Sequence, residues 1–338
     1  MRFDRFQADA LYGPDGFYAD GGVAGRGGDF VTAVETGRDF AESVALELDA
    51  AWNAAEEPAV FVVVEGGAGV GTLCSDVYAV RPACSDALRW VMVERSDVQR
   101  EAAINRLAHE TFPDAGQLPV AAVRDIGEMQ LGEPVSIVLA NELLDNLPVR
   151  VVRKGEAWEE LFVGLDDGSA TAVWNELDST ASRRAERYGS LVAPSAPFPL
   201  IDHAVQWVVK ARRLLRPGGR VILFDYGATT LELSQRGLDG WLRTYSKQQR
   251  GLGVLENIGG QDITADVAFD QLPGGPRLES QQDWLTARGI LERRAKAAAL
   301  IDRNMSEASS LAAISRVQGI DALIEPDGLG GFVAATWS

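Results

Sequence analysis

The sequence predicts an α/β fold in which buried parallel strands alternate with helices. Three short apolar runs, at 60–64, 88–93 and 135–140, support this class, because continuous runs of this length are typical of strands covered on both faces. Stretches with helical periodicity separate these runs. The first run contains four valines and ends at Glu65, after which a glycine cluster begins. It therefore indicates a strand that feeds a tight loop.

The glycine cluster is the strongest candidate for a ligand site. Gly67, Gly69 and Gly71 lack a Cβ atom, so this backbone can take positive φ and approach a ligand closely, while the next helix directs its N-terminal N–H groups there. A dinucleotide loop would have a third glycine where Thr72 stands. A phosphate loop would have Lys followed by Ser or Thr instead of Thr72-Leu73. The loop therefore predicts a cofactor of another kind, and the alternative is an ordinary glycine turn.

Length, composition and charge limit the possible domain organisation and the classes of partner. At 338 residues with 46% hydrophobic content, the chain is expected to form one main domain with insertions. The formal net charge of −17 argues against nucleic acid and anionic membranes as partners and favours a cationic substrate. No apolar run approaches the roughly 18 residues of a membrane span, and the N-terminus shows no signal-peptide pattern, so a cytoplasmic location is expected.

The cysteines and histidines do not predict a metal site. Cys74 and Cys84 lack the spacing of zinc ligands, and His109 and His203 lie far apart in the sequence. Cys74 is expected to be a small buried apolar residue.

The first part of the chain is expected to be irregular, followed by one helix. Residues 1–30 combine turn residues, aromatic residues and many glycines, which indicates either a lid or a mobile N-terminal arm. Apolar residues at helical spacing predict a helix from Glu35 to about Trp52, with Thr32 and Thr36 as candidate caps.

Acidic residues follow the second and third predicted strands. Glu94 ends the strand at 88–93 and lies 23 positions beyond Gly71, a spacing at which a carboxylate can accept both ribose hydroxyl hydrogens of an adenosine ligand. Asp125 follows the strand at 120–123 and is a candidate for contact with an adenine amine. The alternative for Glu94 is a solvated acid at a strand end.

Polar and acidic residues also follow the fourth predicted strand, at 135–140. Asn141, Glu142 and Asp145 come directly after it. The carboxyl ends of parallel strands border the crevice in which open α/β sheets bind ligands, so these residues are site candidates. The alternative is that Asn141 or Asp145 caps the next helix.

The remaining elements follow from turn signals and periodicity. They are a hairpin within 149–163, a helix at 202–215 that stops at 216–219, a fifth strand at 220–227, a weakly periodic insertion at 228–276, a helix near 295–317 and a strand at 332–337.

These elements predict how the chain divides into six segments. The segments are an N-terminal arm, glycine-rich lid and first helix (1–58), the cofactor-binding half of the core (59–148), a hairpin-containing insertion (149–200), a core helix and fifth strand (201–227), a second insertion over the cleft (228–282), and the C-terminal helices and last strands (283–338).

Taken together, these motifs resemble those of the MidA-type S-adenosylmethionine (SAM)-dependent methyltransferases, a bacterial and mitochondrial family that includes protein arginine methyltransferases assisting assembly of respiratory complex I. The matching stretches, in the family's order, are 11–14 with 16–18, 28–32 with Glu35, 65–73, 93–96, 140–148, 225–227, 242–245 and 261–265. The N-E-x-x-D-x-L-P pattern at 141–148 and the G-D-F-x-T pattern at 28–32 are the most specific of these.

The resemblance implies a Rossmann-like class I fold with a seven-stranded, mostly parallel sheet and inserted lid segments. It implies SAM as cofactor and S-adenosyl-L-homocysteine as product. The residues expected to bind SAM are Glu65, Gly67, Gly69, Gly71, Glu94, Asp125, Asn141, Asp29 and Thr32. Glu142 and Asp145 would orient the methyl acceptor and take its proton, since the very high pKa of an arginine guanidinium requires a carboxylate for both tasks.

The chain departs from the family mainly on the acceptor side. Ala33-Val34 replaces Ser-Pro, Asp266 replaces a histidine, and 246–249 lacks the basic, histidine-bearing stretch. The usual leading helix before Phe6 is missing, and no lysine follows Phe332. The acceptor is therefore expected to be a protein or a small molecule, and a homodimer is compatible with the sequence. Two alternatives stay open, a small-molecule or peptide N- or O-methyltransferase and a non-catalytic SAM-binding assembly factor.

Overall fold

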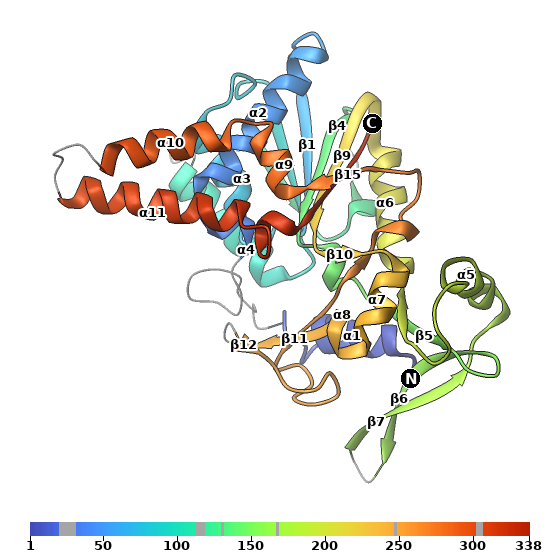
Figure 1. Ribbon diagram of the computed structural model, residues 1–338. Coiled ribbons are helices and arrows are strands. Elements are labelled where there is room, and N and C mark those ends of the chain that lie inside the picture. Colours follow the sequence, from blue (N-terminus) through green and yellow to red (C-terminus); the bar gives the residue numbers. More distant parts are fainter. Residues whose placement is uncertain (20–31, 112–118, 130–131, 167–168, 247–248, 302–306) are drawn as a thin grey trace. The chain divides into compact units, whose positions relative to one another are not determined.

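The computed structural model describes residues 1–19, 32–111, 119–129, 132–166, 169–246, 249–301 and 307–338 (Figure 1). The chain forms two compact units. The sheet unit comprises Val31–Asn141, Ala211–Phe224 and Arg277–Ser338, and the insertion unit comprises Met1–Phe30, Glu142–Lys210 and Asp225–Pro276.

The sheet unit is built on seven strands in the order β15-β16-β9-β4-β1-β2-β3. Strand β1 pairs in parallel with β2 and β4, β2 pairs in parallel with β3, and β4 with β9, whereas β15 and β16 are antiparallel. The strands are β1 (Phe61–Gly66), β2 (Leu88–Val93), β3 (Val120–Val123), β4 (Val135–Asn141), β9 (Leu215–Asp225), β15 (Arg277–Ser280) and β16 (Val333–Trp337). The predicted seven-stranded, mostly parallel sheet is confirmed.

Apolar side chains from the strands and the helices form the core of this unit. The helices are α2 (Arg38–Ala54), α3 (Thr72–Val80), α4 (Asp97–Arg106), α9 (Gln281–Thr286), α10 (Ile290–Ile301) and α11 (Glu307–Ile324). The ring of Phe224 on β9 lies 5.1 Å from that of Phe40 on α2 and 4.8 Å from that of Trp284 on α9, both edge to face. Such pairs add to the hydrophobic stabilisation. Cys74 is buried, as expected.

Two predicted helix boundaries in the sheet unit are wrong. Helix α2 begins at Arg38 after Gly37, so neither Thr32 nor Thr36 caps it, and the hydroxyl of Thr36 instead donates to the carbonyl of Ala33 (2.8 Å) in the short 3₁₀ helix Ala33–Glu35. The helix predicted at 295–317 is two helices, α10 and α11, which pack against each other (Figure 1). Residues 302–306 between them lie outside the described ranges.

The insertion unit begins with a helix that the sequence interpretation missed. Helix α1 (Phe3–Tyr12) lies in the segment predicted to be irregular. Phe3, Phe6, Ala10 and Leu11 form its buried face. The apolar residues have helical spacing, but the helix is only ten residues long and turn residues follow it directly, so the periodicity alone did not predict it. The glycines from Gly21 to Gly28 lie outside the described ranges.

A four-stranded antiparallel sheet forms much of the insertion unit, in the order β7-β6-β5-β8. Its strands are β5 (Arg150–Lys154), β6 (Trp158–Asp166), β7 (Ser169–Glu176) and β8 (Phe198–Leu200). The predicted hairpin is confirmed as β5 and β6, which pair in antiparallel register. Strand β7 and helix α5 (Ser179–Gly189) were not predicted. Small buried residues, Ala181 and Ala185, pack α5 into a core beside the rings of Trp158 and Phe198.

The weakly periodic insertion is regular structure in short pieces. It contains α7 (Thr230–Arg236), α8 (Leu238–Trp241), a pair of strands, β10 (Gly227–Ala228) and β14 (Val267–Ala268), and a small sheet of β11 (Leu242–Ser246), β12 (Gln249–Arg250) and β13 (Asp262–Ala265). Helix α6 (Asp202–Leu214) and β9 contribute residues to both units. None of the helices in the described ranges is both long and apolar enough to cross a bilayer.

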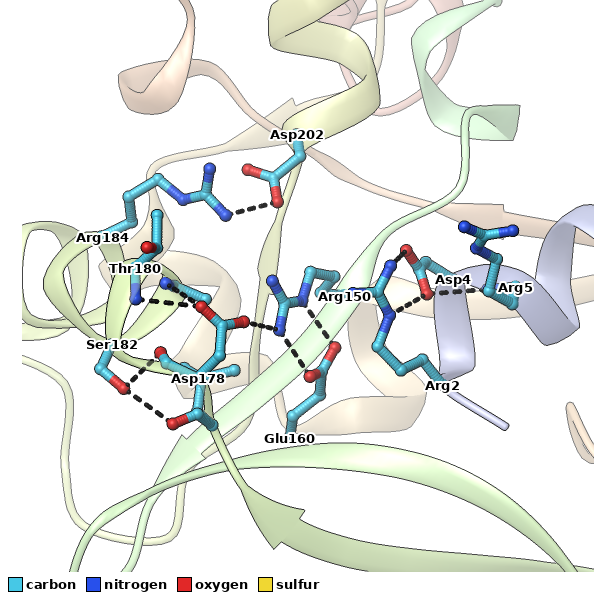
Figure 2. A network of polar contacts seen from close by, with 12 residues as sticks. Arg2, Asp4, Arg5, Arg150, Glu160, Asp178, Thr180, Ser182, Arg184 and Asp202 are labelled. Atoms are coloured by element: carbon cyan, nitrogen blue, oxygen red, sulfur yellow. Dashed lines mark hydrogen bonds and ion pairs between the residues drawn. The ribbon is translucent and has the colours of Figure 1, made fainter.

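A buried ion-pair network holds the insertion unit together (Figure 2). Arg150 on β5 donates two parallel hydrogen bonds of 2.6 Å to the carboxylate of Glu160 on β6. It also donates at 2.8 Å to Asp178, which caps α5 by accepting the backbone N–H groups of Thr180 and Ala181. The guanidinium thereby links a strand pair to the start of a helix.

We expect Arg150→Met to lower the free energy of unfolding by roughly 3 kcal/mol, because it leaves the Glu160 carboxylate buried without its partner. Arg153→Met is the matched control. Arg153 pairs with Glu159, and both side chains are about 30% exposed. Pairs of this kind contribute less than about 1 kcal/mol to the free energy of unfolding. Urea unfolding measures the free energy of unfolding of both variants. Equal losses in the two variants would show that burial does not set the strength of the Arg150 contacts.

Candidate functional site

The glycine loop after β1 has the backbone that the sequence predicts. Gly67, Gly69 and Gly71 have φ of 65°, 53° and 75°, in the left-handed region that favours glycine. A Cβ atom at Gly69 would meet only Oε1 of Gln99, at 3.8 Å, so the space beside this residue is open. At Gly71 a Cβ atom would come within 3.0 Å of the Cβ of Ala103. Gly69 therefore keeps a ligand surface open, and Gly71 allows close packing against α4.

Glu94 is a buried part of this loop, and the alternative of a solvated acid is wrong. Its side chain lies at the end of β2 with the residue only 9% exposed. Oε2 accepts the N–H of Gly69 (2.9 Å) and Oε1 accepts the N–H of Ser96 (2.8 Å). Burial raises the pKa of Glu94, while these backbone hydrogen bonds oppose that shift. Each carboxylate oxygen keeps capacity for a second hydrogen bond, which is what ribose hydroxyls require.

These features fit SAM. The open position at Gly69 leaves room for the ligand, and the Glu94 carboxylate beside it is a suitable acceptor for a ribose. The absence of a lysine in the loop suits a ligand without phosphate. Glu65, Gly67, Gly69, Gly71 and Glu94 are thus brought together in the sheet unit, and their contacts with SAM stay predictions.

Glu65 lies on β1, just before the loop, and its carboxyl group is buried. It is 5% exposed, and Nε1 of Trp90 donates to its Oε2 at 2.9 Å. Burial raises the pKa of Glu65 from 4.5 to about 8, the Trp90 hydrogen bond opposes the shift, and the charge of Glu94 adds to it. Glu65 is therefore expected to be mostly protonated at neutral pH.

This carboxyl group predicts a pH dependence of stability. The unfolded chain releases the Glu65 proton near pH 4.5 and the folded chain near pH 8, so stability falls as the pH rises through that window. Glu65→Gln stays neutral and can still accept the Trp90 hydrogen bond. Between pH 5 and pH 8 the variant should gain on the order of 3 kcal/mol relative to the wild type. Urea unfolding at both pH values tests this, and an unchanged difference between the two proteins would contradict it.

The other predicted cofactor residues have different positions. Asp125 is exposed and accepts the N–H of Gly127 (2.7 Å), so it caps the short helix Ile126–Glu128. Asn141 is the last residue of β4, so it does not cap a helix. Thr32 is buried before the 3₁₀ helix Ala33–Glu35. Asp29 lies outside the described residues.

The predicted acceptor residues belong to the insertion unit, where they lie in a cluster of buried acids. Asp145 is in the 3₁₀ helix Leu144–Asn146, so it does not cap the next helix. It accepts the hydroxyl hydrogen of Tyr226 through Oδ2. Its backbone N–H (3.3 Å) and that of Leu144 (2.8 Å) donate to Oδ2 of Asp225. Asp225 thereby fixes the turn that carries Asp145.

Asp262 is a further acid of the cluster. Nδ2 of Asn146 donates to Oδ1 of Asp262 (3.0 Å), and the hydroxyl of Tyr18 donates to Oδ1 of Asn146 (3.3 Å). Burial raises the pKa of Asp145 to about 6 and that of Asp262 to about 7, and the charge of Asp145 adds to the shift at Asp262. Burial likewise raises the pKa of Asp225, with the Asp145 charge as the next cause. A cation bound here would relieve this repulsion.

Two features of the cluster indicate a binding role. Oδ1 of Asp145 is buried and has no hydrogen-bond partner among the described residues, and Asp145 is only 3% exposed. A buried acceptor without a partner is costly and calls for a ligand or an ordered water. Glu142 has a φ of 52°, which is strained for a non-glycine residue and is typical of functional sites. The charge of Glu142 also raises the pKa of Asp225.

Asp266, which replaces the family's histidine, holds two arginines. It accepts from Nη1 of Arg236 (2.6 Å) through Oδ2 and from Nη2 of Arg243 through Oδ1. The guanidinium of Arg243 lies 5.1 Å from the centre of the Tyr226 ring. The departure at Asp266 is therefore part of an ordered ion-pair arrangement next to the Asp145 partner Tyr226.

Sequence reasoning missed several members of the cluster as site residues, namely Tyr18, Asn146, Asp225, Tyr226 and Asp262. All of them lie in stretches that resemble the family's motifs. Asp225 ends the fifth strand and Tyr226 comes directly after it, much as Glu142 and Asp145 come after the fourth strand. That strand-end position was the available signal. In the ranges that the structure describes, no three or more His, Cys, Asp or Glu side chains are arranged to hold a metal ion.

Comparison with known proteins identifies the family. The model described as "Putative S-adenosyl-L-methionine-dependent methyltransferase" matches residues 43–284. The chain is 28% identical over 288 residues to the Drosophila melanogaster protein named "Protein arginine methyltransferase NDUFAF7 homolog, mitochondrial", covering 78% of this chain and 64% of that protein. It is also 28% identical over 284 residues to the rat protein arginine methyltransferase NDUFAF7, covering 76% of this chain and 62% of that protein. The chain thus spans slightly less than two thirds of the length of these relatives.

A solved structure shares the fold. A Burkholderia thailandensis protein described as a "likely methyl transferase", crystallised with S-adenosyl-homocysteine, superposes with a TM-score of 0.83 and 24% identity, covering 100% of this chain and 87% of that one. The family match confirms the predicted resemblance and the predicted cofactor. The chain belongs to the family of S-adenosyl-L-methionine-dependent methyltransferases that this model describes.

Proposed function

We propose that this chain transfers the methyl group of SAM to a guanidinium nitrogen of a protein arginine, with Glu142 and Asp145 serving the acceptor. The observation that carries the proposal is the buried Oδ1 of Asp145, which lacks a hydrogen-bond partner among the described residues. The relatives in fly and rat are named protein arginine methyltransferases. An arginine side chain has five N–H donors in a planar fork and suits such a group of acceptors.

The chemistry requires little more than positioning and removal of one proton. SAM supplies a methyl group on a positively charged sulfur. Holding the acceptor in line is worth on the order of 7 to 11 kcal/mol. A guanidinium is protonated at any ordinary pH, so its nitrogen becomes nucleophilic only as a carboxylate takes a proton. Burial raises the pKa of Asp145, which makes its carboxylate a stronger base for that proton than an exposed carboxylate.

Two neighbouring residues hold Asp145 in the orientation that the acceptor requires. Asp225 holds the backbone of Leu144 and Asp145, and Tyr226 fixes one oxygen of Asp145, which leaves the other oxygen directed to the acceptor. The net charge of −17 attracts a cationic protein surface at low ionic strength. A small-molecule acceptor is the second candidate, because Asp266 and 246–249 depart from the family on the acceptor side. A cytoplasmic location and a homodimer remain predictions from the sequence.

The test is a transfer assay with SAM labelled in its methyl group and a cell lysate as the source of acceptors. After the reaction the lysate is separated into proteins and small molecules. We expect the label in the protein fraction, at a rate that falls as added salt screens the charge. Label confined to neutral small molecules would favour the second candidate. Binding of SAM without any labelled product would favour a non-catalytic binding protein.

A further inference from the structure

Three polar side chains from separate segments of the sheet unit meet beside the glycine loop. Thr72 is the first residue of α3, Glu35 the last of the 3₁₀ helix Ala33–Glu35, and Arg106 the last of α4. Nη1 of Arg106 donates to the hydroxyl oxygen of Thr72 at 2.6 Å, and that hydroxyl donates to Oε1 of Glu35 at 3.1 Å. Both hydrogen bonds involve a charged group and are therefore stronger than neutral ones.

Arg106 also contacts the loop itself. Its Nη1 donates to the backbone carbonyl of Val70 at 3.2 Å. On the other side, Glu94 accepts the N–H of Gly69. Two consecutive residues of the loop are thus held from α4 and from the end of β2. The Thr72 hydroxyl, in turn, fixes the Arg106 guanidinium and links it to Glu35.

We propose that Glu35, Thr72 and Arg106 are positioning residues that hold the glycine loop in its SAM-binding conformation before SAM arrives, and thereby set the affinity for SAM. The inference rests on the proposed function, because it assumes that SAM binds at this loop. Fixing the backbone of a flexible segment costs conformational entropy. A loop with three glycines at positive φ has many other conformations available, and holding it in advance moves that cost from binding to folding.

Thr72→Val tests the proposal, because valine has nearly the same shape but neither donates to Glu35 nor accepts from Arg106. Calorimetric titration should show roughly tenfold weaker binding of both SAM and S-adenosyl-L-homocysteine. Thr72→Ser keeps the hydroxyl and should bind within about twofold of the wild type. Ser75→Ala is the control, since Ser75 is one turn further along α3 and its hydroxyl bonds Thr111 at 2.8 Å instead of the loop.

Arg106→Met should weaken binding by a similar factor, and the double variant with Thr72→Val should be little worse than either single change because both act through the same contacts. If Thr72→Val does not fold, Arg106→Met decides the question in the same titration. Wild-type affinity in whichever of these variants folds, or no rescue by Thr72→Ser, would overturn the proposal. A wild-type protein that binds neither ligand would instead refute the proposed function.

Discussion

Replacing Asp145 with alanine should slow methyl transfer by roughly 10² to 10⁴-fold, the usual loss when a general base or a positioning carboxylate is removed. The reason is that Asp145 presents a buried oxygen that has no hydrogen-bond partner in the described part of the chain, while Tyr226 and Asp225 fix its orientation. The affinity for SAM should stay within about threefold, less than 1 kcal/mol. Glu142→Ala should behave in the same way, and the rate is measured with labelled SAM.

The control for this change is Asp239→Ala, which removes an exposed acid on α8 of the same unit. It should leave the rate unchanged. A second variant, Asp145→Asn, keeps an acceptor for the Tyr226 hydroxyl but removes the charge, so it should be nearly as slow as alanine. If the double variant of Glu142 and Asp145 labels the same species at the wild-type rate, these residues do not serve the acceptor.

Gly69→Val should abolish SAM binding, raising the dissociation constant from micromolar to above millimolar, roughly a thousandfold. A branched side chain would occupy the open space at this position, and the φ of 53° is unfavourable for valine. The measurement is titration calorimetry with SAM and with S-adenosyl-L-homocysteine.

Gly218→Val separates the two causes. Gly218 also has a positive φ, 77°, and a Cβ atom there would meet no described atom within 4 Å, but Gly218 lies on β9, away from the glycine loop in sequence. This control should lose stability from backbone strain while it keeps its SAM affinity. Equal affinity in the wild type and Gly69→Val would show that SAM does not contact the loop at this residue.

The sheet strands were predictable from the sequence because their signal is local. The runs at 60–64, 88–93 and 135–140 are continuous, apolar and bounded by polar residues, and each became a strand close to its predicted limits. Elements that are short, or whose apolar and polar residues alternate only weakly, were missed. Helix α5 packs mainly through Ala181 and Ala185, and small residues give a weak apolar pattern. Strand β7 is largely exposed and has no buried face, so its sequence lacks the apolar alternation that predicts a strand.

The site was only half predictable, for a physical reason. Glu94 has a fixed distance in sequence from the glycine loop, so its position could be inferred. The contacts of Asp145 with Tyr226 and of Asn146 with Asp262 join residues 81 and 116 positions apart, and tertiary packing alone decides them. Likewise, the sequence shows Asp266 only as a departure from the family on the acceptor side, and its ion pairs with Arg236 and Arg243 become visible only in the folded structure.

The measurement that tests the central claim most directly is mass-spectrometric localisation of the transferred methyl group. The protein is incubated with SAM carrying a deuterated methyl group and the lysate proteins, and the labelled protein is digested and sequenced. We predict the deuterated methyl on a guanidinium nitrogen of an arginine, and its loss with Asp145→Ala. A label found only on lysine, on a carboxyl group or on a neutral small molecule would contradict the account.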